Sequence, residues 1–213
     1  MANTAHQVSH PVSAVLLAAG ESRRMGEVNK LELEFAGVPL VRGTAMTLLT
    51  SGLQEVVVVI GHEAERTREL LDGLALRLVY NENYREGQMT SVHKGLAALQ
   101  QPCDGVMICL SDLPLLEAGD VNTLIEAFVN RKHGSVLVPT YQGQRGNPII
   151  LAHEHREAIL AGERNLGCKR LIEKNPALVC GFEMPNNHVV VDLDTPEDYR
   201  TLQETAEPAA ASA

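Results

Sequence analysis

Two arginines and a lysine follow an apolar segment near the beginning of the chain. The apolar residues 15–19 end abruptly at Gly20, and Arg23, Arg24 and Lys30 come next. A continuous apolar run of this kind is typical of a strand that is buried on both faces. Backbone N–H groups in the loop after such a strand can bind phosphate oxygens, and nearby cations neutralise their charge. These residue types therefore predict a loop that binds a phosphorylated ligand.

Small residues at the end of the run leave room for a flat base or a phosphate chain to approach the backbone. Neither GxxxxGKS/T nor GxGxxG is present. The segment does resemble the signature of nucleotidyltransferases, and this resemblance implies that a nucleotide contacts Leu17, Ala18, Ala19, Gly20, Ser22, Arg24 and Lys30. Arg24 and Lys30 are the expected catalytic residues, because cations can neutralise the charge that develops on a transferring phosphate. The alternative interpretation is a tight strand–helix turn with solvated cations.

Three aspartates lie in two segments that follow apolar runs. Asp112 comes after the run 105–110, in LSDLP, and Asp192 and Asp194 lie in VDLDTP. The two acids of the second segment are separated by one residue, so they point to the same side of an extended chain. Mg²⁺ prefers oxygen ligands and usually takes one or two carboxylates from a protein. We therefore predict Mg²⁺ ligands at two candidate places, one at Asp112 and the other at one or both of Asp192 and Asp194. The alternative is that these acids cap helices, although Thr195 can cap the last helix.

Two further polar segments are candidates for ligand contacts. Thr90 and Ser91 lie where a polar loop enters a predicted helix, and helix N-termini bind anions and polar ligand edges. Ser91 as the helix N-cap is the alternative. The turn formed by Arg145, Gly146 and Asn147 is predicted to be either a wall of the acceptor site or an ordinary hairpin loop.

The segments that carry these residues alternate between strand-like and helix-like patterns. Strands are predicted at residues 15–19, 55–60, 74–80, 105–110, 135–139, 148–151, 177–182 and 188–191, with an edge strand at 31–35. Helices are predicted at residues 40–51, 63–71, 90–100, 118–131, 153–160 and 166–174, and from residue 195 onward. This alternation predicts right-handed βαβ units, an α/β fold and a mainly parallel sheet. Because ligands bind at the carboxyl ends of parallel strands, Gly20, Asp112 and the turn at Gly61 should lie along one rim.

Composition and charge limit the classes of protein that fit. The chain has 213 residues, 45% of them hydrophobic, and we expect one domain at residues 12–205 with flexible tails at 1–11 and 206–213. The formal net charge of −9 argues against a nucleic-acid binder, so a phosphate site must be a local basic pocket. The four cysteines lack metal-site spacing, no run is long enough to span a membrane, and residues 1–11 do not resemble a secretory signal. We expect a cytoplasmic protein.

Five segments of the chain, taken together, resemble the MobA-like nucleotidyltransferase family. They are LAAGESRRMGEVNKL, YNENYREGQMTSV, LSDLPLL, GQRGNPIIL and VDLDTPEDY, and they occur in this order over roughly residues 12–199. The resemblance implies a Rossmann-like three-layer nucleotidyltransferase fold with Mg²⁺ as cofactor. The segments are most similar to molybdenum cofactor cytidylyltransferases, which implies CTP as donor and the molybdopterin cofactor as acceptor. Guanylyltransferase relatives carry LAGG where this chain has LAAG, so the resemblance also favours cytosine over guanine.

Three functions remain open on these grounds. The first is transfer of CMP from CTP to molybdopterin, which gives molybdopterin cytosine dinucleotide and pyrophosphate. The second is nucleotidyl transfer to a sugar or polyol phosphate, and the third is a non-catalytic nucleotide-binding cofactor chaperone. Lys30, Asp112 and the pair Asp192/Asp194 together argue against the third, because a binder would not need metal-binding carboxylates. The expected partners are CTP, molybdopterin and a molybdoenzyme or its chaperone, with no nucleic acid and no membrane.

Overall fold

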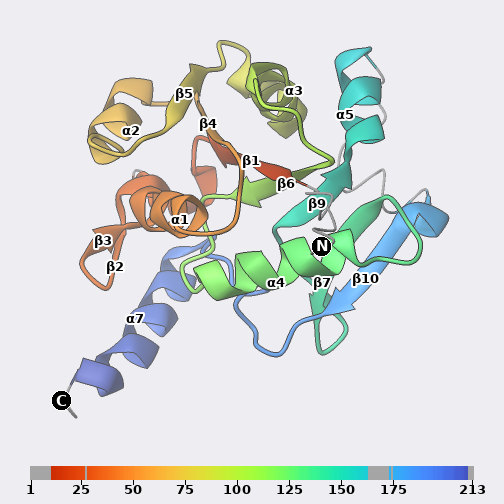
Figure 1. Ribbon diagram of the computed structural model, residues 1–213. Helices are drawn as coiled ribbons and strands as arrows, with labels where there is room; N and C mark the ends of the chain where they lie inside the picture. Colours follow the sequence, from red (N-terminus) through yellow and green to blue (C-terminus); the bar gives the residue numbers. More distant parts are fainter. Residues whose placement is uncertain (1–10, 27, 163–172, 174, 211–213) are drawn as a thin grey trace, which may run out of the picture.

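One large mixed sheet forms the centre of the protein. The computed structural model describes residues 11–26, 28–162, 173 and 175–210. The sheet has eight strands in the order β10-β7-β9-β6-β1-β4-β5, with β8 paired to β7 (Figure 1). The strands are β1 (Val12–Ala18), β4 (Val56–Ile60), β5 (Arg77–Tyr80), β6 (Gly105–Leu110), β7 (Val136–Tyr141), β8 (Gln144–Arg145), β9 (Ile149–Ala152) and β10 (Val179–Glu183).

The strand that leads into the predicted phosphate loop lies in the middle of the parallel part of the sheet. Leu16 of β1 pairs with Val58 of β4 on one side and with Cys109 of β6 on the other. Every residue of β1 is buried, which explains why all of them except Ser13 are apolar. β5 extends the parallel part beyond β4, whereas β9 runs antiparallel to both β6 and β7. The predicted α/β fold with a mainly parallel sheet is confirmed.

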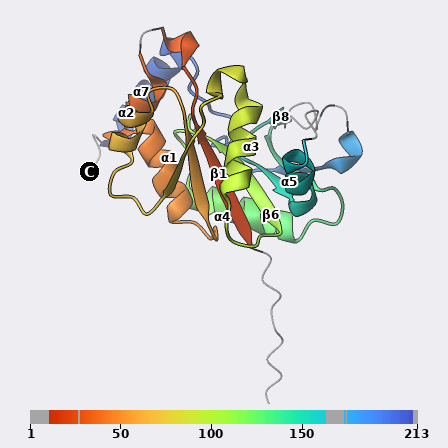
Figure 2. The same cartoon turned by 90° about the horizontal axis from the view of Figure 1, so that it is seen from above.

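Helices cover both faces of the sheet and make three layers. The α-helices are α1 (Leu40–Leu49), α2 (Ala64–Leu70), α3 (Gln88–Ala98), α4 (Ala118–Val129), α5 (His153–Leu160) and α7 (Pro196–Ala210). Short 3₁₀ helices are η1 (Arg23–Met25), η2 (Lys30–Glu32), η3 (Tyr84–Glu86) and η4 (Pro176–Leu178). Buried residues of α1 and α4 share one hydrophobic core with one face of β1, β4 and β6, and residues of α3 and α5 share a second core with the other face. Figures 1 and 2 show the two pairs of helices on opposite sides of the sheet.

Two predicted strands are wrong. Residues 31–35 do not join the main sheet, because Lys30–Glu32 forms η2 and only β2 (Glu34–Phe35) pairs, with β3 (Val38–Pro39), in a separate two-stranded sheet. Residues 188–191 form a turn in which Val190 N–H donates to the Asn187 carbonyl at 3.0 Å. Apart from residue 173, the helix predicted at 166–174 lies outside the described residues.

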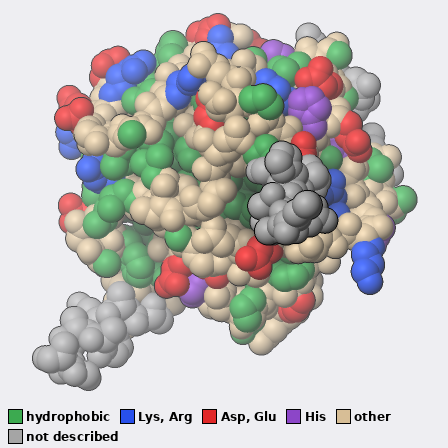
Figure 3. Space-filling view, in the orientation of Figure 1, with side chains coloured by type: hydrophobic (Ala, Val, Ile, Leu, Met, Phe, Trp, Pro, Cys, Tyr) green, Lys and Arg blue, Asp and Glu red, His purple; other side chains and the backbone are tan. Residues whose placement is uncertain are grey.

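The surface carries charges of both signs. On the face shown in Figure 3, basic side chains are interspersed with acidic ones and do not gather into one patch. Within the part of the chain that the structure describes, no helix combines the length and the apolar character that crossing a membrane requires.

Candidate active site

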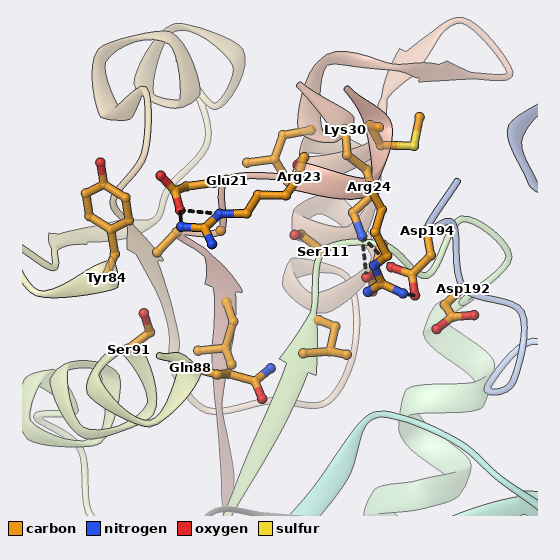
Figure 4. Close-up of a pocket in the computed structure, with 18 residues that line it drawn as sticks. Glu21, Arg23, Arg24, Lys30, Tyr84, Gln88, Ser91, Ser111, Asp192 and Asp194 are labelled. Atoms are coloured by element: carbon orange, nitrogen blue, oxygen red, sulfur yellow. Dashed lines mark hydrogen bonds and ion pairs between the residues drawn. The ribbon is translucent and has the colours of Figure 1, made fainter. Parts of the chain in front are cut away.

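A cleft of about 460 Å³ opens at the carboxyl ends of β1 and β6 (Figure 4). Its walls include most of the predicted site residues, namely Leu17, Ala19, Gly20, Ser22, Arg24, Lys30, Ser91, Asp112, Asp192 and Asp194. The further lining residues are Glu21, Arg23, Met25, Leu31, Tyr84, Gln88, Leu110 and Ser111. The fold thus brings the cations of the loop and all three aspartates to one rim of the sheet. For the loop after β1 and for Asp112 this was expected, because the strands before them end side by side.

The loop after β1 turns sharply and places its arginines at the cleft. Ser22 has a positive φ of 50°, and its carbonyl oxygen accepts a bond from Met25 N–H at 2.8 Å. Met25 is buried and packs with Leu40 and other apolar residues, which anchors the loop between its two ends. Ala18 is also buried and belongs to the core, so its side chain does not line the cleft.

A glycine after β4 permits close packing beside the loop. A Cβ atom on Gly61 would lie 2.8 Å from the Cβ atoms of both Ala19 and Tyr84, closer than side-chain carbons approach. His62 N–H also donates to the Ala19 carbonyl at 3.2 Å. Any larger residue at position 61 would therefore displace the floor of the cleft or the Tyr84 ring.

Lys30 is held between two of the predicted metal ligands. Its Nζ atom lies 2.7 Å from Asp112 Oδ2 and 3.2 Å from Asp194 Oδ1, and Arg24 Nη1 lies 2.5 Å from Asp194 Oδ2. The Lys30 and Asp112 side chains are only 13% and 14% exposed. Asn29 accepts a bond from the Leu31 N–H at 3.0 Å and so caps the short helix η2 that carries Lys30. Lys30 is therefore a positioned residue of the cleft and not a solvated surface lysine.

The alternative that Asp112, Asp192 and Asp194 cap helices can be compared with the caps observed at α4 and α7. At α7, Asp198 Oδ2 accepts bonds from Thr195 N and Oγ1 at 2.7 and 2.8 Å, and these bonds lower the pKa of Asp198. At α4, Glu117 and Asp120 form a reciprocal capping box. Capping by Asp112 at α4 is thus excluded, and the last helix is capped through Thr195 as the sequence indicated.

The aspartates of the cleft offer the carboxylate oxygens that Mg²⁺ prefers as ligands. Asp112 Oδ1 is buried and has no hydrogen-bond partner among the described residues, so this oxygen is available to a metal ion. Desolvation, together with the negative charges of Asp194 and Asp112, raises the pKa of Asp192. No three His, Cys, Asp or Glu side chains in the described ranges converge as a ready-made metal cage. Mg²⁺ commonly takes one or two carboxylates and completes its shell with water and substrate phosphates.

The helix that follows the polar loop contributes only one of its two predicted residues to the cleft. Ser91 lies inside α3, is buried and accepts a bond from Asn81 Nδ2 at 2.9 Å. It is therefore not the N-cap, a position that Gly87 occupies. Thr90 faces a neighbouring hollow, where its hydroxyl lies 2.9 Å from the carbonyl oxygens of Asn83 and Gly87.

The predicted acceptor turn lies beside the cleft and not in it. Arg145 and Asn147 line an adjoining cavity of about 220 Å³, which shares Gln88 and Leu110 with the main cleft. Gly146 lines neither cavity, but a Cβ atom there would lie 2.3 Å from the Val189 carbonyl oxygen, so the two backbones are in close contact.

Sequence reasoning missed an acidic residue and an aromatic ring at the opposite end of the cleft. Glu21 pairs with Arg23 at 2.6 Å and with Arg85 at 3.5 Å, and the hydrogen bond from Arg23 lowers the pKa of Glu21. The Arg85 guanidinium also lies over the Tyr84 ring, 5.4 Å from its centroid. Tyr84 reaches the cleft from η3, in a polar loop whose sequence pattern does not predict the direction of side chains. Gln88 was missed because it is the first residue of α3, which begins before the helix predicted at residues 90–100.

Comparison with protein families gives one match that covers most of the chain. The model described as "MobA-like NTP transferase domain" matches residues 14–179. This range includes the loop after β1, Lys30, Asp112 and the turn at Arg145, whereas Asp192 and Asp194 follow it.

Individual proteins similar to this chain have names of different kinds. It is 28% identical over 200 residues to "Nicotine blue oxidoreductase" of Paenarthrobacter nicotinovorans, covering 90% of this chain and 96% of that protein. It is 23% identical over 202 residues to "Molybdenum cofactor cytidylyltransferase" of Escherichia coli (strain K12), covering 91% and 96%. Among solved structures, a nucleotidyl transferase from Methanothermobacter thermautotroptrophicus superposes with a TM-score of 0.79 at 22% identity, covering 94% of this chain and 100% of that one. The last comparison shows that the fold is that of a nucleotidyltransferase.

Proposed function

Because the chain belongs to the MobA-like NTP transferase family and is a nucleotidyltransferase of that family, we propose that it transfers CMP from CTP to the molybdopterin cofactor. The products are molybdopterin cytosine dinucleotide and pyrophosphate. Similarity to the E. coli molybdenum cofactor cytidylyltransferase over nearly the whole of both chains supports this acceptor. Family membership alone does not determine the reaction, since another similar protein is named as an oxidoreductase. The arrangement of charges in the cleft supports transfer.

The observation that carries the proposal is the position of Lys30. It lies at the junction of the small-residue loop and the aspartates, 2.7 Å from Asp112 and 3.2 Å from Asp194. Nucleotidyl transfer needs this combination, because a triphosphate carries several negative charges that cations must neutralise, and a divalent ion needs carboxylates. A protein that only binds nucleotide does not need the metal-binding carboxylates.

In the proposed reaction, a terminal phosphate oxygen of the acceptor attacks the α-phosphorus of CTP. The new P–O bond forms as the bond between the α-phosphorus and the bridging oxygen breaks, and its electron pair leaves with pyrophosphate. Lys30 and Arg24 neutralise the negative charge that develops on the phosphate oxygens, and backbone N–H groups of the loop after Ala19 hold the phosphates. Bound Mg²⁺, held by Asp112 with Asp192 or Asp194, would polarise those oxygens and neutralise part of their charge.

The two ends of the substrate complex have separate places in this proposal. The cytosine lies over Ala19 and Gly20, with Ser91 nearby on α3. The acceptor occupies the adjoining cavity, where Arg145 can pair with its phosphate and Asn147 can donate a hydrogen bond. Gln88 borders both cavities and lies where the two substrates would meet. The loaded cofactor then passes to a molybdoenzyme or its chaperone.

Pyrophosphate release with each nucleoside triphosphate, measured with and without molybdopterin, tests the proposal. We expect release with CTP only when molybdopterin is present, and loss of release in Lys30→Ala. Lys132→Ala removes an exposed lysine outside the cleft and serves as the matched control. Release that requires a sugar or polyol phosphate in place of molybdopterin would overturn the acceptor assignment. No release with any acceptor would favour a nucleotide-binding chaperone.

A further inference from the structure

The segment that carries Asp192 and Asp194 has no regular secondary structure to hold it. Residues 184–195 connect β10 to α7 without a helix or a strand. Three buried side chains, Met184, Val189 and Leu193, anchor the segment to the rest of the molecule. Apolar contacts are not directional, so polar contacts must fix the orientation of the turn between them.

A buried carboxylate provides two of the side-chain contacts of this segment. Asp120, whose side chain is 7% exposed, accepts a bond from His188 Nδ1 at 2.8 Å and from Asn186 Nδ2 at 2.9 Å. The same carboxylate accepts the Glu117 N–H at 3.0 Å in the capping box of α4. Because an ionised carboxylate only accepts hydrogen bonds, His188 Nδ1 must carry the proton of this bond. We call Asp120, Asn186 and His188 the Asp120 cluster.

The Asp120 cluster joins the two segments that carry the candidate metal ligands. α4 begins directly after the Ser111–Glu117 segment, which includes Asp112, and His188 belongs to the segment that carries Asp192 and Asp194. Leu193 N–H donates to the Asp112 carbonyl at 3.0 Å, so the two segments are also in direct contact beside the ligands.

The turn at His188 also supports the predicted acceptor turn. The carbonyl oxygen of Val189 accepts a bond from Asn147 N–H at 2.8 Å. Gly146 packs against the same carbonyl, since a Cβ atom there would lie only 2.3 Å from the Val189 oxygen. A shift of His188 would therefore be transmitted toward the metal ligands in one direction and toward the acceptor cavity in the other.

We propose that His188 is a positioning residue which, through its bond to Asp120, holds Asp192 and Asp194 where they can bind a divalent cation. The inference rests on the proposed metal role of these aspartates. His188 touches neither aspartate and does not line the cleft, so it acts only through the backbone of its own segment. Loss of the bond from Nδ1 should weaken metal binding by more than the accompanying loss of stability explains.

Titration of the full chain with Mn²⁺ alone, followed by electron paramagnetic resonance of the free ion, tests this. His188→Leu removes the donor, whereas His188→Asn retains an N–H donor near the place of Nδ1. We expect the Kd for Mn²⁺ to rise about tenfold in His188→Leu, the lower end of the range for residues bonded directly to a metal ligand, because His188 acts on the ligands through the backbone. We expect His188→Asn to return to within about threefold of wild type, since it restores the bond.

A second variant separates positioning from stability. Ile159 lies in the core between α5 and the sheet and does not line the cleft. Ile159→Val should therefore lower the melting temperature and leave the contacts of residues 184–195 unchanged. We expect it to keep the wild-type Kd for Mn²⁺. Equal Mn²⁺ affinity in His188→Leu and wild type would overturn the inference. Failure of His188→Asn to restore affinity, or no Mn²⁺ binding by the wild type, would overturn it as well.

Transfer activity does not enter this measurement, so the two proposals can fail separately. A wild-type protein that binds Mn²⁺ with the expected dependence on His188, yet transfers no CMP, would refute the proposed function and leave the role of His188 in place.

Discussion

Replacement of Asp112 by alanine should abolish turnover and leave the fold intact. One oxygen of this carboxylate lies 2.7 Å from Lys30 Nζ, and the other is buried without a partner among the described residues. The substitution therefore removes a candidate metal ligand and one of the two anions that position Lys30. Lys30 keeps the contact with Asp194 at 3.2 Å, so its charge is not left unpaired.

The two expected magnitudes differ widely. Removal of one group that stabilises transition-state charge costs about 3–4 kcal/mol, which is roughly a 10²- to 10³-fold loss of kcat. Breaking a buried ion pair costs about 3–5 kcal/mol when it strands a charge. Here Asp194 still pairs with Lys30 and the buried, unpaired Oδ1 disappears with the side chain, so we expect a loss of only about 1–2 kcal/mol in the free energy of unfolding.

Steady-state pyrophosphate release at saturating Mg²⁺ and CTP gives kcat, and urea denaturation gives the free energy of unfolding. Asp72→Ala, at an exposed aspartate distant from the cleft, is the matched control and should change neither quantity. Near-normal kcat for Asp112→Ala at saturating Mg²⁺ would refute the reasoning, because it would make the carboxylate dispensable for the reaction. A loss of stability above about 5 kcal/mol would instead assign Asp112 a structural role.

Three further predictions concern base choice, metal binding and thiol chemistry. Ala19→Gly should narrow the preference for CTP over GTP by about 1–3 kcal/mol in kcat/KM without raising CTP activity; a wild-type preference for GTP would contradict the argument from the loop. Because the pKa of Asp192 is raised, protons compete with the metal for this carboxylate at higher pH than for an ordinary aspartate. Mn²⁺ affinity should therefore weaken as the pH falls toward the pKa of Asp192, and it should weaken less in Asp192→Asn. Parallel pH profiles of the two proteins would contradict this. In a Cys168→Ser background, a thiol reagent should label Cys180 in the native protein but label Cys109 only after denaturation, because Cys109 is buried and burial raises its pKa. Rapid labelling of Cys109 in the native protein would contradict this.

The sequence predicted the sheet well where burial is uniform. β1 is buried at every residue, so its apolar run has only one interpretation, and its end at Ala18 places the loop at the rim. The prediction failed at residues 188–191, where three successive valines resemble a strand. Only Val189 is fully buried there, and hydrogen bonds from His188 and Asn186 to Asp120 favour a turn over a strand.

Local sequence patterns predicted some features of the site, but contacts between residues far apart in the sequence could not be predicted from them. The position of Asp112 after a strand was sufficient to place it on the same rim as the loop after β1, whereas the spacing of Asp192 and Asp194 indicated only that both acids share one side of the chain. That Lys30 would lie between Asp112 and Asp194 depends on side-chain contacts across 82 and 164 positions, which no local pattern encodes. The contact of Tyr84 with Gly61 is of the same kind, because it follows from the packing of η3 against the end of β4.

Mass spectrometry of the product tests the proposed transfer of CMP to the molybdopterin cofactor. The protein is incubated with CTP, Mg²⁺ and molybdopterin, and the cofactor is analysed after release. We expect a gain of one cytidylyl group on the cofactor with one pyrophosphate released per group transferred, and no gain in Lys30→Ala. An unchanged cofactor in the wild-type reaction, or a guanylyl adduct formed in preference when GTP competes with CTP, would contradict it.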